Sequence, residues 1–184
     1  IQIFTIARHV EKKGLEYAIN AVATFDTDIS ITYAIAGDGP LRKKLEELIE
    51  RVDTHDRVTL LGYRPQSEIQ EMLRSADIFL LPSVTSQGGD KEGTPTALLE
   101  AQASGVPVIS TTHAGIPEIV DDGETGILVP ERDIDQIQEA LHTLIRDEQM
   151  RQIMGEYGRE KVLENHSIEA VATRLNRLYD SVRS

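Results

Sequence analysis

The sequence predicts a single α/β domain with a doubly wound, mainly parallel sheet of six strands and a helical tail at the C-terminus. Two observations predict this fold. Short apolar runs alternate with longer amphipathic runs along the 184 residues, as in parallel strands joined by helices. The first four short runs are almost continuously apolar, as expected of strands that helices cover on both faces. No repeat, linker or low-complexity segment interrupts residues 1–184, so one domain is expected.

The expected strands and helices alternate along the chain. The strands are IQIFTIA at 1–7, ISITYAIA at 29–36, RVTLLG at 57–62, ADIFLLP at 76–82, VPVIST at 106–111 and TGILVP at 125–130. The helices are expected at 14–25, 40–52, 66–75, 95–104, 116–121 and 133–146, with further helix from about 147 to the C-terminus. This order is Rossmann-like, and in such sheets ligands bind outside the carboxyl ends of the strands. A site is therefore expected at the loops 7–14, 36–40, 62–66, 82–95 and 111–116.

The composition excludes several classes of function. Lysine and arginine number 19 and aspartate and glutamate 31, so the formal net charge is −12. A surface this acidic repels nucleic acid and anionic lipid, so nucleic acid is not an expected partner and membrane association is not indicated. The absence of cysteine excludes disulfides, cysteine-ligated zinc and thiol catalysis, and it fits a reducing cytoplasm. The chain begins in an apolar segment without a methionine, so we expect it to be a piece of a longer protein.

The loop after the first expected strand, ARHVEKKG, carries three cations. Arg8 ends the strand, and Lys12 and Lys13 come directly before a helix that is expected to begin near Gly14. An anion at a helix N-terminus would suit this cluster, because arginine can bind two phosphate oxygens while lysine supplies a point charge. A solvated basic turn is the alternative.

The loop after the second strand, AGDGP, is expected to turn tightly. Gly37 and Gly39 allow positive φ angles, and Pro40 suits the first turn of the next helix. Such a turn lets the backbone approach a flat ligand closely, but it is also an ordinary connection between a strand and a helix.

Two glutamates flank the start of the helix in the segment EGTPTALLEAQASG at 92–105. That helix is expected to begin near Pro95, so Thr96 and Glu100, one turn apart, share a face. Glu92 lies ahead of the helix N-terminus. The N–H groups expected beside it belong to Thr94, Thr96 and Ala97.

An anion bound at this helix N-terminus would have Arg8 and Lys13 opposite it, and the two carboxylates could accept hydrogen bonds from hydroxyls at its two ends. A diphosphate with a sugar on each side has this arrangement of charge and hydroxyl groups. The alternative is an acidic residue that interacts with the helix dipole and an exposed glutamate two turns later.

Six segments of the chain, in order, resemble the C-terminal half of the group 1 glycosyltransferases, the retaining family 4 enzymes with the GT-B fold. They are ARHVEKKG, AGDGP, RVTLLGY, ADIFLLPSV, EGTPTALLEAQASGVPVIST and AGIPEIVDDGETGILVP, which cover roughly residues 4 to 131. The pair of glutamates separated by seven residues in the fifth segment is the most specific feature. The details VEKKG, GGDKEGTP and HAGIPE are similar to the bacterial surface-polysaccharide branch, such as the colanic acid transferases.

The resemblance implies a role for each matching residue. Arg8 and Lys13 would neutralise the donor diphosphate. Glu92 would face the hydroxyls of the transferred sugar. Arg8, Lys13 and Glu92 are therefore the expected catalytic residues. Glu100 would hold the nucleotide ribose. The expected backbone contacts to the phosphates lie at Gly93, Thr94, Thr96 and Ala97, and the contacts to the base at Gly37, Gly62 and Tyr63.

The activity that the resemblance implies is transfer of a sugar from a UDP-, GDP- or ADP-sugar to an acceptor hydroxyl, with retention and without a metal or other cofactor. The acceptor, a carbohydrate or a lipid-linked molecule, would bind an N-terminal domain that this chain lacks. The chain alone should therefore bind donor weakly and be inactive. A cytoplasmic protein, peripheral at the inner membrane through the absent half, is expected.

The pairs Asp26–Asp28 and Asp133–Asp135 are interpreted as a turn and a helix start, not as metal ligands.

Three residues depart from the family pattern. Ala7 stands where glycine is usual, Pro95 replaces a common glycine and removes one N–H, and Gln102 replaces a common methionine with an expected effect on packing only. Two histidines near the site are expected to be structural. His113 is interpreted as a turn residue and His9 as a local packing or capping residue.

Two other functions remain open at this point. A sugar-nucleotide epimerase of GT-B-like fold would need its own acid and base, and the sequence offers none. A non-enzymatic nucleotide-binding or signalling domain of flavodoxin-like topology is the second, although a receiver domain would carry an acidic pair after the first strand, where this chain has Arg8 and Lys13.

Overall fold

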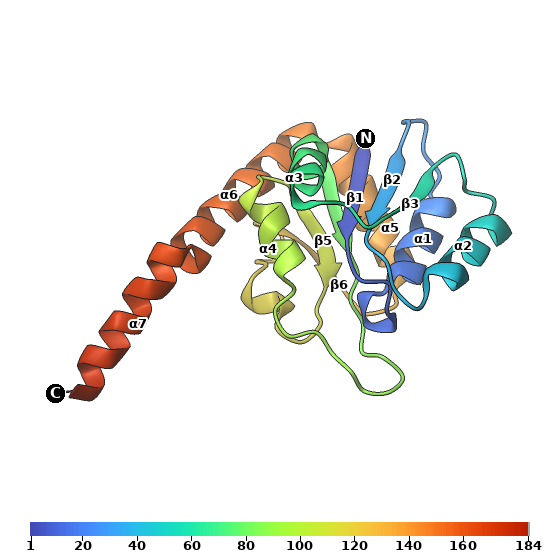
Figure 1. Ribbon diagram of the computed structural model, residues 1–184. Coiled ribbons are helices and arrows are strands. Elements are labelled where there is room, and N and C mark those ends of the chain that lie inside the picture. The colour runs from blue at the N-terminus through green and yellow to red at the C-terminus, as the bar shows by residue number, and fades with distance from the viewer. Residues whose placement is uncertain (184) are drawn as a thin grey trace.

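The computed structural model of the protein describes residues 1–183, with side chains through residue 179. Its centre is an all-parallel sheet of six strands in the order β3-β2-β1-β4-β5-β6 (Figure 1). The strands are β1 (Gln2–Ile6), β2 (Thr32–Ala36), β3 (Val58–Gly62), β4 (Ile78–Leu81), β5 (Val108–Thr111) and β6 (Gly126–Val129). The predicted doubly wound fold is confirmed, and the order of the strands reverses between β1 and β4.

Helices cover the two faces of this sheet. They are α1 (Leu15–Ala23), α2 (Arg42–Arg51), α3 (Gln66–Ser75), α4 (Thr96–Ala103), α5 (Ile134–Arg146), α6 (Glu148–His166) and α7 (Ile168–Arg183), with the short 3-10 turns η1 (Glu11–Lys13) and η2 (Ile116–Glu118). On one face α1 packs against α2 and α5, and elsewhere α4 packs against α6. Each predicted strand and long helix is present, with ends that differ by a few residues.

The helix predicted at 116–121 is only the 3-10 turn η2. The residues that follow it form a different hydrogen-bonded turn, because the Thr125 hydroxyl accepts from the Asp121 N–H at 2.9 Å. The Thr125 N–H in turn donates to the Asp121 carbonyl at 2.9 Å. Side-chain hydrogen bonds of this kind compete with helix formation, so the helix stops early.

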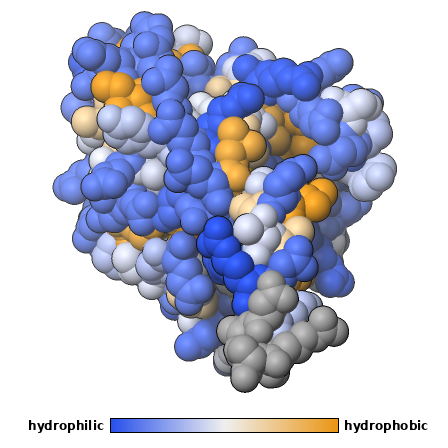
Figure 2. All heavy atoms as spheres, turned by 90° about the vertical axis from the view of Figure 1, so that its left-hand side faces the viewer, coloured by the Kyte–Doolittle hydropathy of each residue, from blue (hydrophilic) through white to orange (hydrophobic). Residues whose placement is uncertain are grey.

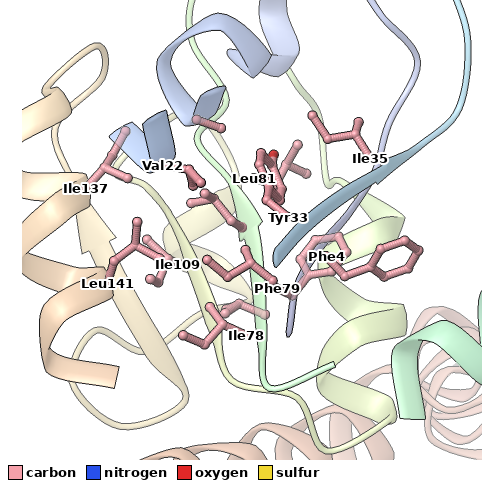
Figure 3. Close-up of a cluster of buried hydrophobic side chains, with 14 of the residues drawn as sticks. Phe4, Val22, Tyr33, Ile35, Ile78, Phe79, Leu81, Ile109, Ile137 and Leu141 are labelled. Atoms are coloured by element: carbon pink, nitrogen blue, oxygen red, sulfur yellow. The ribbon is translucent and has the colours of Figure 1, made fainter. Parts of the chain in front are cut away.

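The core lies between the sheet and its helices. Phe4 on β1 and Phe79 on β4 meet edge to face, with ring centroids 6.4 Å apart. All four residues of β4 are buried, as expected of a central parallel strand. The buried side chains labelled in Figure 3 come from β1, β2, β4 and β5 and from helices α1 and α5; they are Phe4, Val22, Tyr33, Ile35, Ile78, Phe79, Leu81, Ile109, Ile137 and Leu141. This core fixes where each strand ends, and so where its loop begins.

Helix α7 extends away from the body of the domain (Figure 1). It presents exposed apolar residues at intervals of three and four along one side: Ile168, Val171, Leu175 and Leu178. Figure 2 views the molecule from the left-hand side of Figure 1, toward which α7 extends, and shows apolar residues bordered by hydrophilic ones. Among the described residues, no helix is both long enough and apolar enough to span a membrane.

Candidate functional site

A cavity of about 430 Å³ opens at the carboxyl ends of β1, β2 and β3, beside the N-terminus of α4. This is the edge of the sheet where the strand order reverses, the usual ligand position in such folds. The same edge carries the long loop between β4 and α4 (Figure 1). The lining residues are Ile6, Ala7, Arg8, Lys13, Ala36, Gly37, Tyr63, Arg64, Gln66, Ile69, Thr96, Ala97 and Glu100. Seven of the eleven predicted site residues are among them.

At the wall of the cavity formed by the end of β2, the backbone at Gly37 cannot carry a side chain. Gly37 has a φ of 129°, and a Cβ there would lie 2.0 Å from the Ala7 carbonyl oxygen. Its N–H donates to the Gly62 carbonyl at 2.9 Å, so Gly62 stands behind Gly37 and does not line the cavity itself. Tyr63, the next residue, is 79% exposed at the rim. The predicted close approach of backbone to a flat ligand is possible here.

The cations of the first loop have different environments. Arg8 is exposed at the cavity and makes no ion pair with any described residue. Lys12 points away and pairs with Asp90 at 3.2 Å. Lys13 lines the cavity, and its Nζ lies 2.9 Å from Glu92 Oε1. The predicted cluster of three cations is therefore reduced to two at the cavity, of which only Arg8 lacks an acidic partner.

Glu92 sits just outside the cavity lining, with its side chain only 7% exposed. The Lys13 ammonium is close enough for an ion pair, yet Oε1 accepts no well-aligned hydrogen bond from any described residue. A buried carboxylate oxygen without a hydrogen bond is costly and is therefore a strong acceptor for an incoming hydroxyl. The structure thus brings Lys13 and Glu92 together more closely than the sequence predicted.

Helix α4 contributes its N-terminus and one face to the cavity. The cap residue Pro95 has no side chain that could accept a hydrogen bond from the helix, so N–H groups of the first turn remain available to an anion. Thr96 and Glu100, one turn apart, both line the cavity, as expected, and Ala97 does so too. The predicted phosphate contacts at Gly93 and Thr94 lie outside the lining, where these two residues pack against Gly115.

The opposite face of α4 is buried and includes Gln102. Its amide nitrogen lies 3.2 Å from the Thr125 hydroxyl, whereas its carbonyl oxygen has no partner among the residues that the structure describes. The interpretation of Gln102 as a packing residue was thus incomplete, because it also joins α4 to the turn before β6.

His113 is a contact that sequence reasoning missed. It does form the turn after β5, as expected, but its ring is buried and joins two other loops. The Glu92 N–H donates to His113 Nε2 at 3.0 Å, and His113 Nδ1 lies 2.6 Å from Glu131 Oε1. The available signal for this contact was the position of the two residues. His113 follows the end of one strand and Glu131 follows the end of the next strand.

Glu131 is also bound by Thr85 at the start of the long loop. The Thr85 N–H donates to it at 2.7 Å and the Thr85 hydroxyl lies at 3.1 Å. Burial opposes ionisation of this carboxyl, but the hydrogen bonds from the Thr85 backbone, His113 and the Thr85 hydroxyl outweigh it and lower the pKa of Glu131 to about 2.

His9 follows Arg8 in the chain and is fully buried, and neither ring nitrogen has a hydrogen-bond partner within the described part of the chain. Burial lowers its pKa most; Arg42 acts in the same direction, while Asp38 and Glu46 oppose the shift. Its main chain bonds to the turn after β2, where the His9 N–H donates to the Asp38 carbonyl at 2.9 Å. His9 therefore packs locally, as expected.

The two Asp-x-Asp pairs lie away from the cavity lining. Asp133 caps α5 by accepting from the Gln136 N–H at 3.0 Å, as a helix start should. Asp28 pairs with Arg146 at 3.0 Å. Within the described part of the chain, no three acidic, histidine or cysteine residues are grouped as metal ligands would be.

Taken together, the cavity offers the Arg8 guanidinium, the N-terminus of α4, a second cation and the Glu100 carboxylate, and the Glu92 carboxylate lies just outside its lining. The cations and the helix can bind an anion, and the carboxylates can accept hydrogen bonds from hydroxyl groups on either side of it. Flat backbone at Gly37 and the exposed ring of Tyr63 leave room for an aromatic base.

Comparison with known proteins identifies the family of the chain. The family described as "Glycosyl transferases group 1" matches residues 1–161. A protein of Salmonella typhimurium described as "Putative colanic acid biosynthesis glycosyltransferase WcaL" is 39% identical over 184 residues. The match covers 99% of this chain and 45% of that protein. The chain thus spans less than half the length of this relative.

Two solved structures share the fold. The C-terminal domain of a group 1 glycosyl transferase, LpcC of Francisella tularensis, is 27% identical with a TM-score of 0.79, over 91% of this chain and 86% of that domain. Anabaena HepE, solved with UDP-glucose, is 21% identical with a TM-score of 0.85, over 98% of this chain and 48% of that one. At that identity the likeness to HepE concerns the fold alone.

Proposed function

Because the chain belongs to the group 1 glycosyl transferases, we propose that it is the donor-binding half of a retaining, metal-independent hexosyltransferase that uses a nucleotide diphosphate sugar. One observation carries this proposal. Arg8, the uncapped N-terminus of α4 and Glu100 line a single cavity at the strand ends, which is an anion site with a hydroxyl acceptor beside it. The polysaccharide relatives indicate a role in surface-polysaccharide or glycoconjugate biosynthesis.

The diphosphate would lie between Arg8 and the first turn of α4. When the glycosyl bond to the diphosphate breaks, the leaving nucleoside diphosphate gains negative charge. Preorganised cations and helix N–H groups stabilise such charge without reorganisation. Lys13 completes this set once it turns from Glu92 toward the phosphates, so that the residues at the cavity supply the charge that a metal ion would otherwise provide.

The two carboxylates divide the hydroxyl groups of the donor. Glu100 lines the cavity one turn into α4, where the ribose of the nucleotide would lie. Glu92 stands ahead of the helix, where the transferred sugar would lie, and release of Lys13 frees its buried oxygen to accept from a sugar hydroxyl. The base would rest against the backbone near Gly37 and Tyr63.

The acceptor would bind a second, N-terminal domain. The relatives are more than twice as long as the region they share with this chain, and α7 carries exposed apolar residues that a partner domain would bury. The acceptor is a carbohydrate or a lipid-linked molecule in this proposal. The whole enzyme is cytoplasmic, peripheral at the inner membrane through that domain, and the present chain alone binds donor without transferring it.

Ligand-observed NMR on this chain tests the proposal, with UDP-glucose, UDP-galactose, GDP-mannose, UDP and GDP as probes. Arg8→Ala and Glu100→Ala should each weaken binding about tenfold, as loss of a charge-assisted hydrogen bond does. Arg74→Ala, on the exposed end of α3, is the matched control and should leave affinity unchanged. Binding of one nucleotide class that both site variants weaken supports the proposal. Failure of the folded chain to bind any probe at millimolar concentration contradicts it.

A further inference from the structure

The main chain of Glu92 is held by a buried histidine and not only by its own loop. The Glu92 N–H donates to His113 Nε2 at 3.0 Å, and the other ring nitrogen of His113 lies 2.6 Å from Glu131. The His113 ring is 1% exposed, so water does not compete for these contacts. The turn after His113 also supports the next residue of the loop, because a Cβ on Gly115 would lie 3.0 Å from the Gly93 carbonyl.

These partners define the protonation of the ring. A backbone N–H can only donate, so Nε2 of His113 must accept. Glu131 is ionised at neutral pH, because its pKa is lowered to about 2, and an ionised carboxylate can only accept. Nδ1 must therefore carry the proton, and the ring is the neutral Nδ1–H tautomer. A ring protonated at Nε2 would direct a second donor at the Glu92 N–H.

Glu131 ties both ends of the long loop between β4 and α4. At the start of the loop it accepts from the N–H and hydroxyl of Thr85. At the other end it acts through His113 on Glu92. One carboxylate thus sets the distance between the two ends of the loop, and with it the position of Glu92 relative to the cavity.

We propose that His113, oriented by Glu131, is a positioning residue that fixes the main chain of Glu92 so that its carboxylate meets the transferred sugar. The inference rests on the proposed function, in which Glu92 faces that sugar. Among the described residues, Lys13 forms the ion pair that holds the Glu92 side chain, and Oε1 accepts no aligned hydrogen bond. The place of its backbone therefore decides where the carboxylate lies when Lys13 turns to the diphosphate.

The consequence is selective. Loss of the His113 contact should weaken recognition of the sugar, while the diphosphate and base sites at Arg8, α4 and Gly37 stay intact. A merely structural role would instead weaken the binding of nucleotide and nucleotide sugar alike. The affinity for UDP-glucose divided by that for UDP separates the two, with GDP-mannose and GDP as the pair if guanine nucleotides are the ones that bind.

The experiment has two parts. In the unmodified chain, ¹⁵N NMR of the histidine rings should show His113 as the Nδ1–H tautomer near neutral pH. In His113→Phe, binding of UDP-glucose should weaken about fivefold, the loss of one hydrogen bond, while UDP affinity stays within about twofold. His113→Gln keeps an acceptor for the Glu92 N–H and should recover part of the loss. His142→Phe, at an exposed histidine of α5, is the matched control.

Glu131→Gln is the second variant should His113→Phe fail to fold. The Thr85 N–H and His113 use different oxygens of Glu131, and in a carboxamide one of these oxygens is replaced by a donor NH2 group, so the variant should produce the same selective loss. An Nε2–H tautomer in the unmodified chain overturns the inference, as does an equal loss for sugar and nucleotide or no loss at all. If nucleotide binds the unmodified chain but the variants show no selective loss, this inference alone fails. If no nucleotide binds the unmodified chain, it is the proposed function that fails, so the two failures are distinguishable.

Discussion

Lys13 Nζ lies 2.9 Å from Glu92 Oε1, and both side chains are almost buried, at 15% and 7% exposed. The pair joins the end of β1 to the loop that precedes α4. In the unliganded protein each charge therefore neutralises the other. A diphosphate that attracts Lys13 would release Glu92, which couples binding of the nucleotide to recognition of the sugar.

Removing one member of this ion pair should lower the free energy of unfolding more than removing both members. Lys13→Met leaves the Glu92 carboxylate buried without a counter-charge, so the free energy of unfolding should fall by about 2–3 kcal/mol. The double variant Lys13→Met/Glu92→Gln should recover most of that loss, because no uncompensated charge remains. Urea unfolding of the four proteins measures the cycle. Additive effects of the two substitutions would show that the pair does not exist in solution.

Gly37 should tolerate no side chain. Its φ of 129° is unfavourable for other residues, and a Cβ would lie 2.0 Å from the Ala7 carbonyl oxygen. Gly37→Ala should therefore lower the free energy of unfolding by about 3 kcal/mol or more. Gly123→Ala is the control, since Gly123 also has a positive φ, of 78°, but open space around it, and its cost should stay near ~1 kcal/mol. Equal losses would contradict the close approach of β1 and β2.

The stability of the domain should depend on pH through Glu131. Its pKa is lowered from 4.5 to about 2 in the folded chain. A depressed pKa adds stability that is fully present above the unfolded value and is lost as the pH falls from about 5 toward 2. The free energy of unfolding of the unmodified chain should therefore fall more steeply between pH 5.5 and 3 than that of Glu131→Gln. Parallel curves would contradict the hydrogen bonds described for this carboxylate.

Gln102→Met should be neutral or stabilise the domain by up to ~1 kcal/mol. The substitution removes a buried carbonyl oxygen that has no partner. Thr125 loses the Gln102 amide but still accepts from the Asp121 N–H. Methionine has a similar volume and can fill the space beside Gly158. A loss above ~1 kcal/mol in urea unfolding would mean that the link between α4 and Thr125 matters more than the unpartnered oxygen.

Most of the fold could be predicted because its signals are local. The run at 66–75 has an amphipathic period between Pro65 and Ala76, and α3 spans those residues. The helix predicted at 116–121 was wrong because the Thr125 hydroxyl binds the Asp121 N–H and ends the helix. The spacing of apolar residues does not report such a side-chain hydrogen bond. Arg8 and Thr96 could be placed near one another because each stands at a strand end or helix start, and all parallel strands end at one edge.

The contacts that organise the site could not be predicted in this way. Lys13 meets Glu92 because β4 lies beside β1. His113 meets Glu131 because β6 lies beside β5. Both depend on the strand order and on the path of a long loop, which periodicity and residue type do not encode. The position of Gly93 and Thr94 outside the cavity lining has the same origin, because Glu131 holds the loop at Thr85 and His113 holds it at Glu92.

The most direct test of the donor site is to map it by titrating UDP or GDP into the ¹⁵N-labelled chain and following its backbone amides. Saturable shifts should centre on Arg8, Gly37, Thr96 and Ala97, the residues that line the cavity at the strand ends. Shifts that instead centre on the distant hollow beside Met150 and Tyr157 on α6 would contradict it, as would a folded chain whose amides do not respond to either nucleotide.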